Sequence, residues 1–271
     1  MKLYLKQGWR LTVKHLYIVI LLFLYELIWG FFLYRIVDHI VVPLLRRYPG
    51  SLPSADAAQI FLTEAQFQLL KTDLIRPYIW LFAGLLAARM LVTPLLNAGL
   101  LHSLRHAADE EGTHFLRGIR AAWKPVALLY LIETALALSP AGWLLPRALD
   151  ALLSSGSAAE LAQRTLPWAA GWLAWAAVLH LLFLAMQFGA VSRTGILKGL
   201  GNGIRRLLPL VGISLLLWLI GASLSLTFAA ASMLWAGLIA LILQQSYHLV
   251  RTIMKVWTVA SQLDVWKSKQ T

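Results

Sequence analysis

Six long apolar runs, separated by short polar and basic segments, dominate the hydrophobic pattern of this chain. Each run approaches or exceeds the ~20 residues that an α-helix needs to cross a hydrocarbon core about 30 Å thick. The runs predict transmembrane helices at about 15–37, 77–101, 125–146, 167–190, 209–228 and 232–254. Length alone separates the last two, because the join at 229–232 contains no proline or glycine. The pattern predicts an all-α membrane protein with a single domain, a bundle of about six transmembrane helices.

Three basic amphipathic segments, at 2–14, 115–124 and 196–206, come just before apolar runs. We call them the basic elbows and expect each to form a helix in the membrane interface. In the first, Leu5, Trp9 and Val13 mark an apolar face. The second and third align in register, with Gly118 opposite Gly199. This order predicts a three-fold repeat of elbow, outward helix and returning helix. The alternative is that juxtamembrane segments collect basic and aromatic residues in any case.

The remaining polar segments predict shorter elements outside the bilayer core. Three prolines and a glycine at 38–54 indicate that the first helix ends before them. Residues 54–76 predict an amphipathic helix, with capping-box spacing at Thr63 and Gln66. After the last run, the tail from Val256 has the pattern of a short amphipathic segment.

The composition excludes a water-soluble globular protein. Hydrophobic residues make up 59% of the chain and charged residues 13%, whereas soluble domains carry about 25% charged residues. The net charge of +12 would indicate nucleic-acid binding in a soluble protein, but here we attribute it to membrane topology and expect no nucleic-acid partner. With no cysteine, the chain has no disulfide, thiolate metal site or thiol nucleophile.

The distribution of basic residues predicts the orientation of the chain. Sixteen Lys and Arg residues lie in the N-terminal segment, in 102–124, in 191–208 and in the tail from Arg251. Seven lie on the opposite side, at Arg35, Arg46, Arg47, Lys71, Arg76, Arg147 and Arg164. We therefore expect both termini in the cytoplasm, and six crossings agree with termini on the same side. The basic start resembles a signal peptide, but the apolar run after it is too long and no small-x-small cleavage site follows, so we expect a first transmembrane helix.

Three ionisable residues, Glu26, Arg89 and Glu133, fall near the centres of predicted transmembrane helices. An isolated charge there is costly, about 2.5–3.5 kcal/mol for an arginine by insertion scales. Their similar depth predicts that Arg89 pairs with Glu26 or Glu133. Such a cluster would either fix helix register or serve a substrate or a proton.

Four further polar residues are predicted inside the membrane: His180, Gln187, Gln244 and Gln245. They would form hydrogen bonds between helices or line a cavity with the charged cluster. His102 and His106 are four residues apart and could bind a divalent metal, but they lack the catalytic glutamate of a His-Glu-x-x-His motif. The segment around them has the composition of a solvated loop, so we expect no metal or other cofactor.

Glycines at four-residue spacing in the third elbow, Gly195, Gly199 and Gly203, do not follow a strand and lack a terminal Lys-Ser/Thr. They predict a close contact with a neighbouring helix and not a phosphate-binding loop. The basic side chains of the elbows predict contacts with the bilayer, in particular with anionic lipid headgroups. These residues are Lys6, Arg10, Arg117, Arg120, Lys124, Lys198, Arg205 and Arg206.

The run TPLLNAGLLHSLRHAADEEGTHFLRGIRAAWKP resembles a loose group of six-helix bacterial membrane proteins, many of them from Firmicutes. The group includes the membrane domain attached to some glycerophosphodiester phosphodiesterases. The shared features are a glycine near a helix end, at Gly99 and Gly189, and an apolar-x-x-Gly elbow ending at Gly118 and Gly199. The resemblance implies a six-helix architecture and a location in a bacterial cell membrane. It does not imply phosphodiesterase activity.

These patterns together predict a non-enzymatic, multi-pass membrane protein that handles lipids or small solutes or assists a protein partner in the membrane. One alternative is a transporter, including a permease subunit of an ATP-driven system, although the usual Glu-Ala-Ala coupling loop is missing. The other is an intramembrane enzyme, for which the apolar runs contain no recognisable nucleophile.

Overall fold

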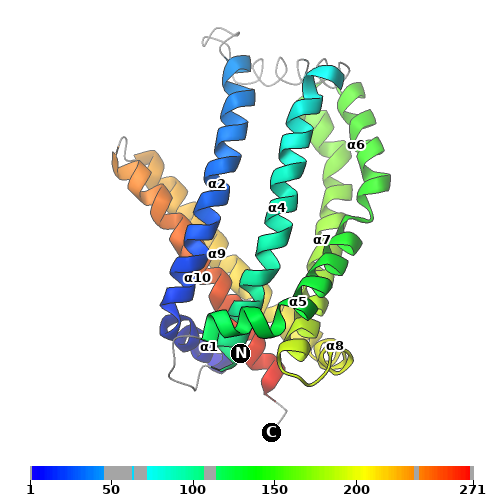
Figure 1. Cartoon of the computed structure of the whole chain (residues 1–271). Helices are drawn as coiled ribbons and strands as arrows, with labels where there is room; N and C mark the ends of the chain where they lie inside the picture. Colours follow the sequence, from blue (N-terminus) through cyan, green and yellow to red (C-terminus); the bar gives the residue numbers. More distant parts are fainter. Residues whose placement is uncertain (1, 46–62, 64–71, 107–113, 235–237, 269–271) are drawn as a thin grey trace. The chain divides into compact units, whose positions relative to one another are not determined.

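The computed structural model describes residues 2–45, 63, 72–106, 114–234 and 238–268. Within these ranges every regular element is an α-helix, which confirms the predicted all-α class (Figure 1). In chain order the helices are α1 (Lys2–Lys14), α2 (Leu16–Leu45), α4 (Thr72–Arg105), α5 (His114–Leu138), α6 (Ala141–Ser154), α7 (Ala158–Val191), α8 (Ile196–Arg205), α9 (Leu207–Leu234) and α10 (Leu238–Lys267).

Five helical stretches in the described part are long and apolar enough to cross a membrane, and they indicate a membrane protein. They are Leu16–His39, Tyr78–Arg105, His114–Ser154, Ala159–Val191 and Leu207–Ser232. The sixth predicted crossing falls on α10, whose first residues are preceded by the gap at 235–237. Six crossings and the three-fold repeat stay predictions.

The chain divides into two compact units. The first comprises Met1–Gly30, Thr93–Tyr130 and Leu181–Thr271, and the second comprises Phe31–Val92 and Leu131–His180. The first unit thus contains all three basic elbows. The second contains α6 and the adjoining parts of α2, α4, α5 and α7.

Several helices extend beyond their predicted bounds. Helix α4 covers Thr72–Arg105 and not 77–101, and α9 continues through the predicted join at 229–232 to Leu234. Helix α2 continues past the predicted end at 37 to Leu45, through Pro43. Helix α7 begins at Ala158 and not at 167. Its start follows from a reciprocal cap: the Glu160 backbone N–H donates to Ser157 Oγ at 3.3 Å, and Gly156 N–H donates to the Glu160 carboxylate at 3.2 Å. Most of the amphipathic helix predicted at 54–76 lies outside the described residues, and residues 72–76 belong to α4.

The predicted transmembrane helix at 125–146 is wrong at both ends. The second elbow and the following run form one helix, α5, which passes through Pro125 and ends at Leu138. The break at Pro140 has a physical cause, since proline supplies no N–H to the carbonyl four residues earlier. That carbonyl, Leu136 O, instead accepts from Ser139 Oγ at 2.8 Å and from Trp175 Nε1 at 3.2 Å. Pro146 lies inside α6 and does not end a helix.

The tail from Val256, predicted as a short amphipathic segment, continues α10 and packs into the core of the first unit. Val256, Ala260, Leu263 and Trp266 of α10 are all buried, and α10 packs against α1 and α9. Trp257 Nε1 donates a 2.9 Å hydrogen bond to the carbonyl of Leu5. The ends of the chain therefore lie near each other, as Figure 1 shows.

The face of α1 that packs against the protein is not the predicted apolar face of Leu5, Trp9 and Val13, whose contact with the membrane interface stays a prediction. Its buried residues are Gly8 and Thr12, while Trp9 and Val13 are exposed. Gly8 lies directly against Ser261 of α10, with no room for a side chain. The small residues therefore face α10, because only they allow the two backbones to approach so closely.

Candidate anion-binding cleft

A cavity of about 310 Å³ in the first unit lies between the ends of α4 and α7 and the middle of α5. We call it the basic cleft. The basic side chains around it are His102, Arg105, His106 and Arg193, and the remaining wall consists of Ala121, Ala122, Pro125, Ala190 and Val191. Among the described residues that line the cleft, four are basic and none is a carboxylate, which is the chemistry of an anion site.

A hydrogen bond between two helix ends positions the first arginine. Arg105 Nη1 donates at 3.0 Å to the carbonyl of Val191, the last residue of α7. The final carbonyls of a helix lack partners within the helix, and a cation there also interacts favourably with the helix dipole. Arg105 thus caps α7 and brings its charge to the cleft.

The second arginine has an unusual backbone conformation. Arg193 has φ = 53°, in the left-handed region that normally favours glycine or asparagine. It follows the last turn of α7, where Thr194 N–H and Thr194 Oγ1 both donate to the carbonyl of Gly189, at 3.2 and 3.3 Å. This is the geometry of a helix C-terminus that ends on a left-handed residue. An arginine at this position costs about 1 kcal/mol in backbone energy.

The two histidines of the cleft lie against each other with tilted rings, and His106 also stacks on His114 outside the cleft lining. The ring centroids of His102 and His106 are 4.3 Å apart, and those of His106 and His114 are 6.1 Å apart with nearly parallel planes. Across the described ranges, no group of three or more His, Asp or Glu side chains is arranged to hold a metal ion. Arg105 and Arg193 also lie close enough for their charges to repel. A bound anion would relieve this repulsion.

Two ionisable residues near the end of α10, Asp264 and Lys267, interact with each other, and Lys267 also interacts with Arg105. Burial raises the pKa of the Asp264 carboxyl, and Lys267 partly offsets this effect. Burial lowers the pKa of Lys267, and the Arg105 charge lowers it further. Asp264 Oδ2 is buried and accepts no hydrogen bond within the described part of the chain. Burial of Asp264 therefore disfavours its charged form, and Lys267 is the charged neighbour that partly restores it.

Glycine contacts hold the second and third elbows against their neighbours. A Cβ on Gly199 would lie 2.7 Å from the Ala185 carbonyl oxygen and 2.9 Å from Gly189 Cα. Gly118 likewise lies against His102, with no space for a side chain. The close helix contact predicted from the glycines of the third elbow is confirmed for Gly199 and for Gly203, which lies against Ala185. It is wrong for the Cβ side of Gly195, since nothing lies within 4 Å of that Cβ position.

Most of the predicted headgroup residues have exposed side chains. Lys6, Arg10, Arg117, Arg120, Lys124, Lys198 and Arg205 are exposed. Arg206 is partly buried, and its Nη1 donates to the carbonyls of Val265 and Trp266 and to Ser268 Oγ. Arg206 therefore caps α10 as Arg105 caps α7. Binding of lipid headgroups by these eight residues stays a prediction.

The predicted intramembrane acids each have a basic partner. Glu26 Oε1 accepts from Lys255 Nζ at 2.9 Å within the first unit. Glu133 Oε1 lies 2.7 Å from His180 Nδ1 within the second unit. Arg89 lies on α4 with an exposed side chain, and its pairing with Glu26 or Glu133 stays a prediction.

Among the other predicted polar residues, the structure describes the side chain of Gln187 but not those of Gln244 and Gln245. Gln187 is almost completely buried in α7. Gln244 and Gln245 lie within α10, but their side chains are outside the described ones. A hydrogen bond between helices that the sequence did not predict joins Gln262 Nε2 to Ser214 Oγ at 2.7 Å.

The basic cleft itself was not predicted from the sequence. In the sequence, Arg105 and Arg193 contributed only to the positive charge that predicts the orientation. His102 and His106 indicated only a possible metal site. One signal was present: each of the two arginines is the first arginine after a long apolar run, where the chain leaves the membrane. Comparison with models of protein families, with curated proteins and with solved structures finds no match.

Proposed function

We propose that this protein is a non-enzymatic, multi-pass membrane protein that handles lipids by binding an anionic headgroup in the basic cleft. The observation that carries this proposal is the convergence of two arginines and two histidines on one cavity whose described lining residues include no carboxylate. Guanidinium groups bind phosphate through paired, charge-assisted hydrogen bonds, and imidazoles add donors. The volume of about 310 Å³ is at the lower end of the range for small-molecule sites and suits one headgroup.

The proposed orientation places the cleft at the cytoplasmic surface of a bacterial cell membrane. The excess of Lys and Arg on one side supports it. The contact between α1 and the end of α10 also supports it, because chain ends that pack together belong on the same side. The cleft lies where α4 and α7 end, which is the depth of lipid phosphates in a helix that has just crossed the hydrocarbon core. The cytoplasmic leaflet supplies anionic lipid at that depth.

The proposal is tested by lipid retention of the purified protein. Protein in detergent is incubated with phosphatidylglycerol or with phosphatidylcholine, and bound lipid is counted by native mass spectrometry. We expect phosphatidylglycerol to be retained preferentially. A parallel sample with excess inorganic phosphate separates two sources of the anion: if free phosphate displaces the lipid, the cleft recognises phosphate alone. Equal retention of the two lipids would contradict the proposal.

One observation favours a second function, proton-coupled transport. The pair formed by Glu133 and His180 lies in stretches long and apolar enough to cross a membrane, and the His180 side chain is 61% exposed. Ionisable pairs within a membrane often mark proton pathways. Vesicles containing the protein would then show proton uptake that Glu133→Gln abolishes. If uptake is absent in the unaltered protein, only lipid binding remains.

A further inference from the structure

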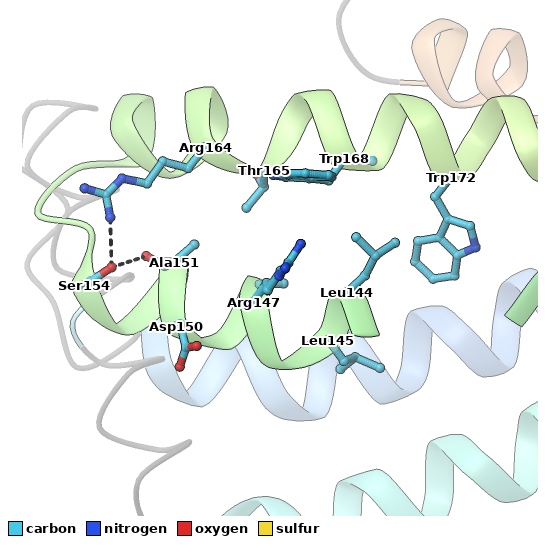
Figure 2. A pocket seen from close by; sticks show the side chains of 12 residues that line it. Leu144, Leu145, Arg147, Asp150, Ala151, Ser154, Arg164, Thr165, Trp168 and Trp172 are labelled. Carbon is cyan, nitrogen blue, oxygen red and sulfur yellow. Dashed lines mark hydrogen bonds between the residues drawn. The ribbon is translucent and has the colours of Figure 1, made fainter. Parts of the chain in front are cut away.

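A second cavity, in the second unit, lies between α6 and the first turns of α7 and has a volume of about 400 Å³. Figure 2 shows it from close by. The walls are mainly apolar, with Leu144 and Ala151 from α6 and Trp168 and Trp172 from α7. We call it the α6–α7 pocket. Its lining residues differ from those of the basic cleft, and different hydrogen bonds hold its walls.

Both ends of the pocket are fixed by hydrogen bonds. At one end Trp172 Nε1 donates at 2.6 Å to the carbonyl of Ala137, in the last turn of α5 before the break at Pro140. At the other end Arg164 donates to Ser154 Oγ at 3.0 Å and pairs with Glu160 at 2.7 Å. The first contact ties α7 to the end of α5, and the bond from Arg164 to Ser154 ties α7 to the end of α6. The cavity is therefore formed before any ligand arrives.

Arg147 supplies a charge within this apolar setting. Its Cζ lies 3.6 Å from the ring centroid of Trp143 and 5.4 Å from that of Trp168, and the two rings meet edge to face at 5.3 Å. Stacking orients the planar guanidinium without using its N–H groups. Among the described residues these N–H groups donate no hydrogen bond to protein. In Figure 2 Arg147 points from α6 toward α7, whereas the carboxylate of Asp150 points away from α7.

We propose that the α6–α7 pocket binds one acyl chain of a membrane lipid together with its acidic headgroup. The chain lies against Leu144, Trp168 and Trp172, and Arg147 donates to the headgroup. The volume, near the lower end of the range for ligand sites, fits one chain and not two. The polar connection that follows α6 places Arg147 near the membrane interface, where acidic headgroups lie. A phospholipid phosphate and a fatty-acid carboxylate share this chemistry.

Photo-crosslinking of the full chain tests the proposal. The purified protein is irradiated with either of two probes, a phosphatidylglycerol or a fatty acid, each with a diazirine on its acyl chain. Peptide mass spectrometry then locates the label. We expect label between Leu144 and Trp172 from at least one probe, and the more efficient probe identifies the headgroup. Arg147→Gln should lower this labelling about ten-fold or more, and Arg147→Lys should lower it less.

A filling variant separates the cavity from the charge. Ala151→Phe leaves Arg147 in place but occupies the pocket, so labelling should fall to background. Ala169→Phe, on the facing wall, replaces it if the first variant does not give a monodisperse, helical protein. Labelling of Arg147→Gln or of the filled variant at the level of the unaltered protein would overturn the proposal. So would label found only outside the two helices.

Discussion

The guanidinium of Arg105, at the end of α4, donates a 3.0 Å hydrogen bond to the carbonyl oxygen of Val191, at the end of α7. One side chain thus closes one wall of the basic cleft and caps the helix that leads into Arg193. The structural role and the proposed binding role of Arg105 cannot be separated by removing it. Experiments on the cleft should therefore change Arg193, and experiments on the scaffold should change residues outside the cleft.

The contact between the third elbow and α7 gives the sharpest prediction about stability. Gly199→Ala places a Cβ against the backbone of Ala185 and Gly189, and we expect it to destabilise the protein by about 1–3 kcal/mol. Gly201→Ala is the matched control on the same helix, since nothing lies within 4 Å of its Cβ position. It should be neutral or stabilise by up to about 1 kcal/mol, as Ala favours helix over Gly. Thermal unfolding in detergent measures both, and equal midpoints would contradict the proposed packing.

The sequence predicted this contact because glycines at a four-residue period have a direct structural meaning. It predicted the apolar runs for the same reason, since length and hydropathy alone decide whether a helix can cross a bilayer. It did not predict how the C-terminal end of α10 packs, since the tail from Val256 was expected only to be a short amphipathic segment. The stripe of Val256, Ala260 and Leu263 was visible at helical spacing, but which neighbours cover it depends on tertiary packing.

For a similar reason the sequence could not show which residues pair with the intramembrane acids. Depth along a helix can be counted from residue numbers, and it placed Glu26, Arg89 and Glu133 at one level. Residue numbers do not show in which direction a side chain points around its helix axis, or which helix it faces. The partners of Glu26 and Glu133 that the structure describes, Lys255 and His180, come from α10 and α7. The basic cleft escaped prediction because four residues separated by up to 91 positions meet there only in the fold.

A double-mutant cycle tests the pair formed by Glu26 and Lys255. Lys255→Met leaves Glu26 without its partner, and we expect a loss between about 1 kcal/mol, as for an exposed pair, and about 3 kcal/mol, as for a buried one. Adding Glu26→Gln should recover part of this loss, because the uncompensated acid is gone. Losses that simply add in the double variant would show that the 2.9 Å contact contributes no coupling energy.

The buried carboxyl of Asp264 predicts how stability depends on pH. Its pKa is raised in the folded protein, so the folded state binds the proton more tightly than the unfolded state. Stability is therefore greatest below the unfolded pKa of about 3.8 and falls as the pH rises through the folded value. Asp264→Asn should remove this decline and raise the unfolding midpoint at neutral pH. A midpoint that falls at neutral pH would show that the ionised carboxylate stabilises the fold, through Lys267.

Single cysteines test the proposed topology. Ser154, next to the connection between α6 and α7, and Ser268, after α10, are both exposed. In intact cells an impermeant thiol reagent should label a cysteine at 154 and not one at 268. Opening the cells should make both reactive. Labelling of position 268 from outside would reverse the orientation and place the basic cleft on the other side of the membrane.

Arg193 allows binding and stability to be separated in one variant. Arg193→Gly removes a guanidinium from the cleft, and glycine adopts φ = 53° without the cost that arginine bears. Its unfolding midpoint should therefore be equal to or higher than that of the unaltered protein. Lys198→Gln, an exposed residue of α8, is the control for loss of one positive charge outside the cleft.

The most direct measurement is phosphatidylglycerol retention by Arg193→Gly, counted by native mass spectrometry beside the unaltered protein and Lys198→Gln. The basic cleft predicts that Arg193→Gly loses about ten-fold or more of this retention while remaining at least as stable, and that Lys198→Gln loses clearly less. If Arg193→Gly retains phosphatidylglycerol as well as the unaltered protein does, the cleft does not bind the headgroup and the central claim is wrong.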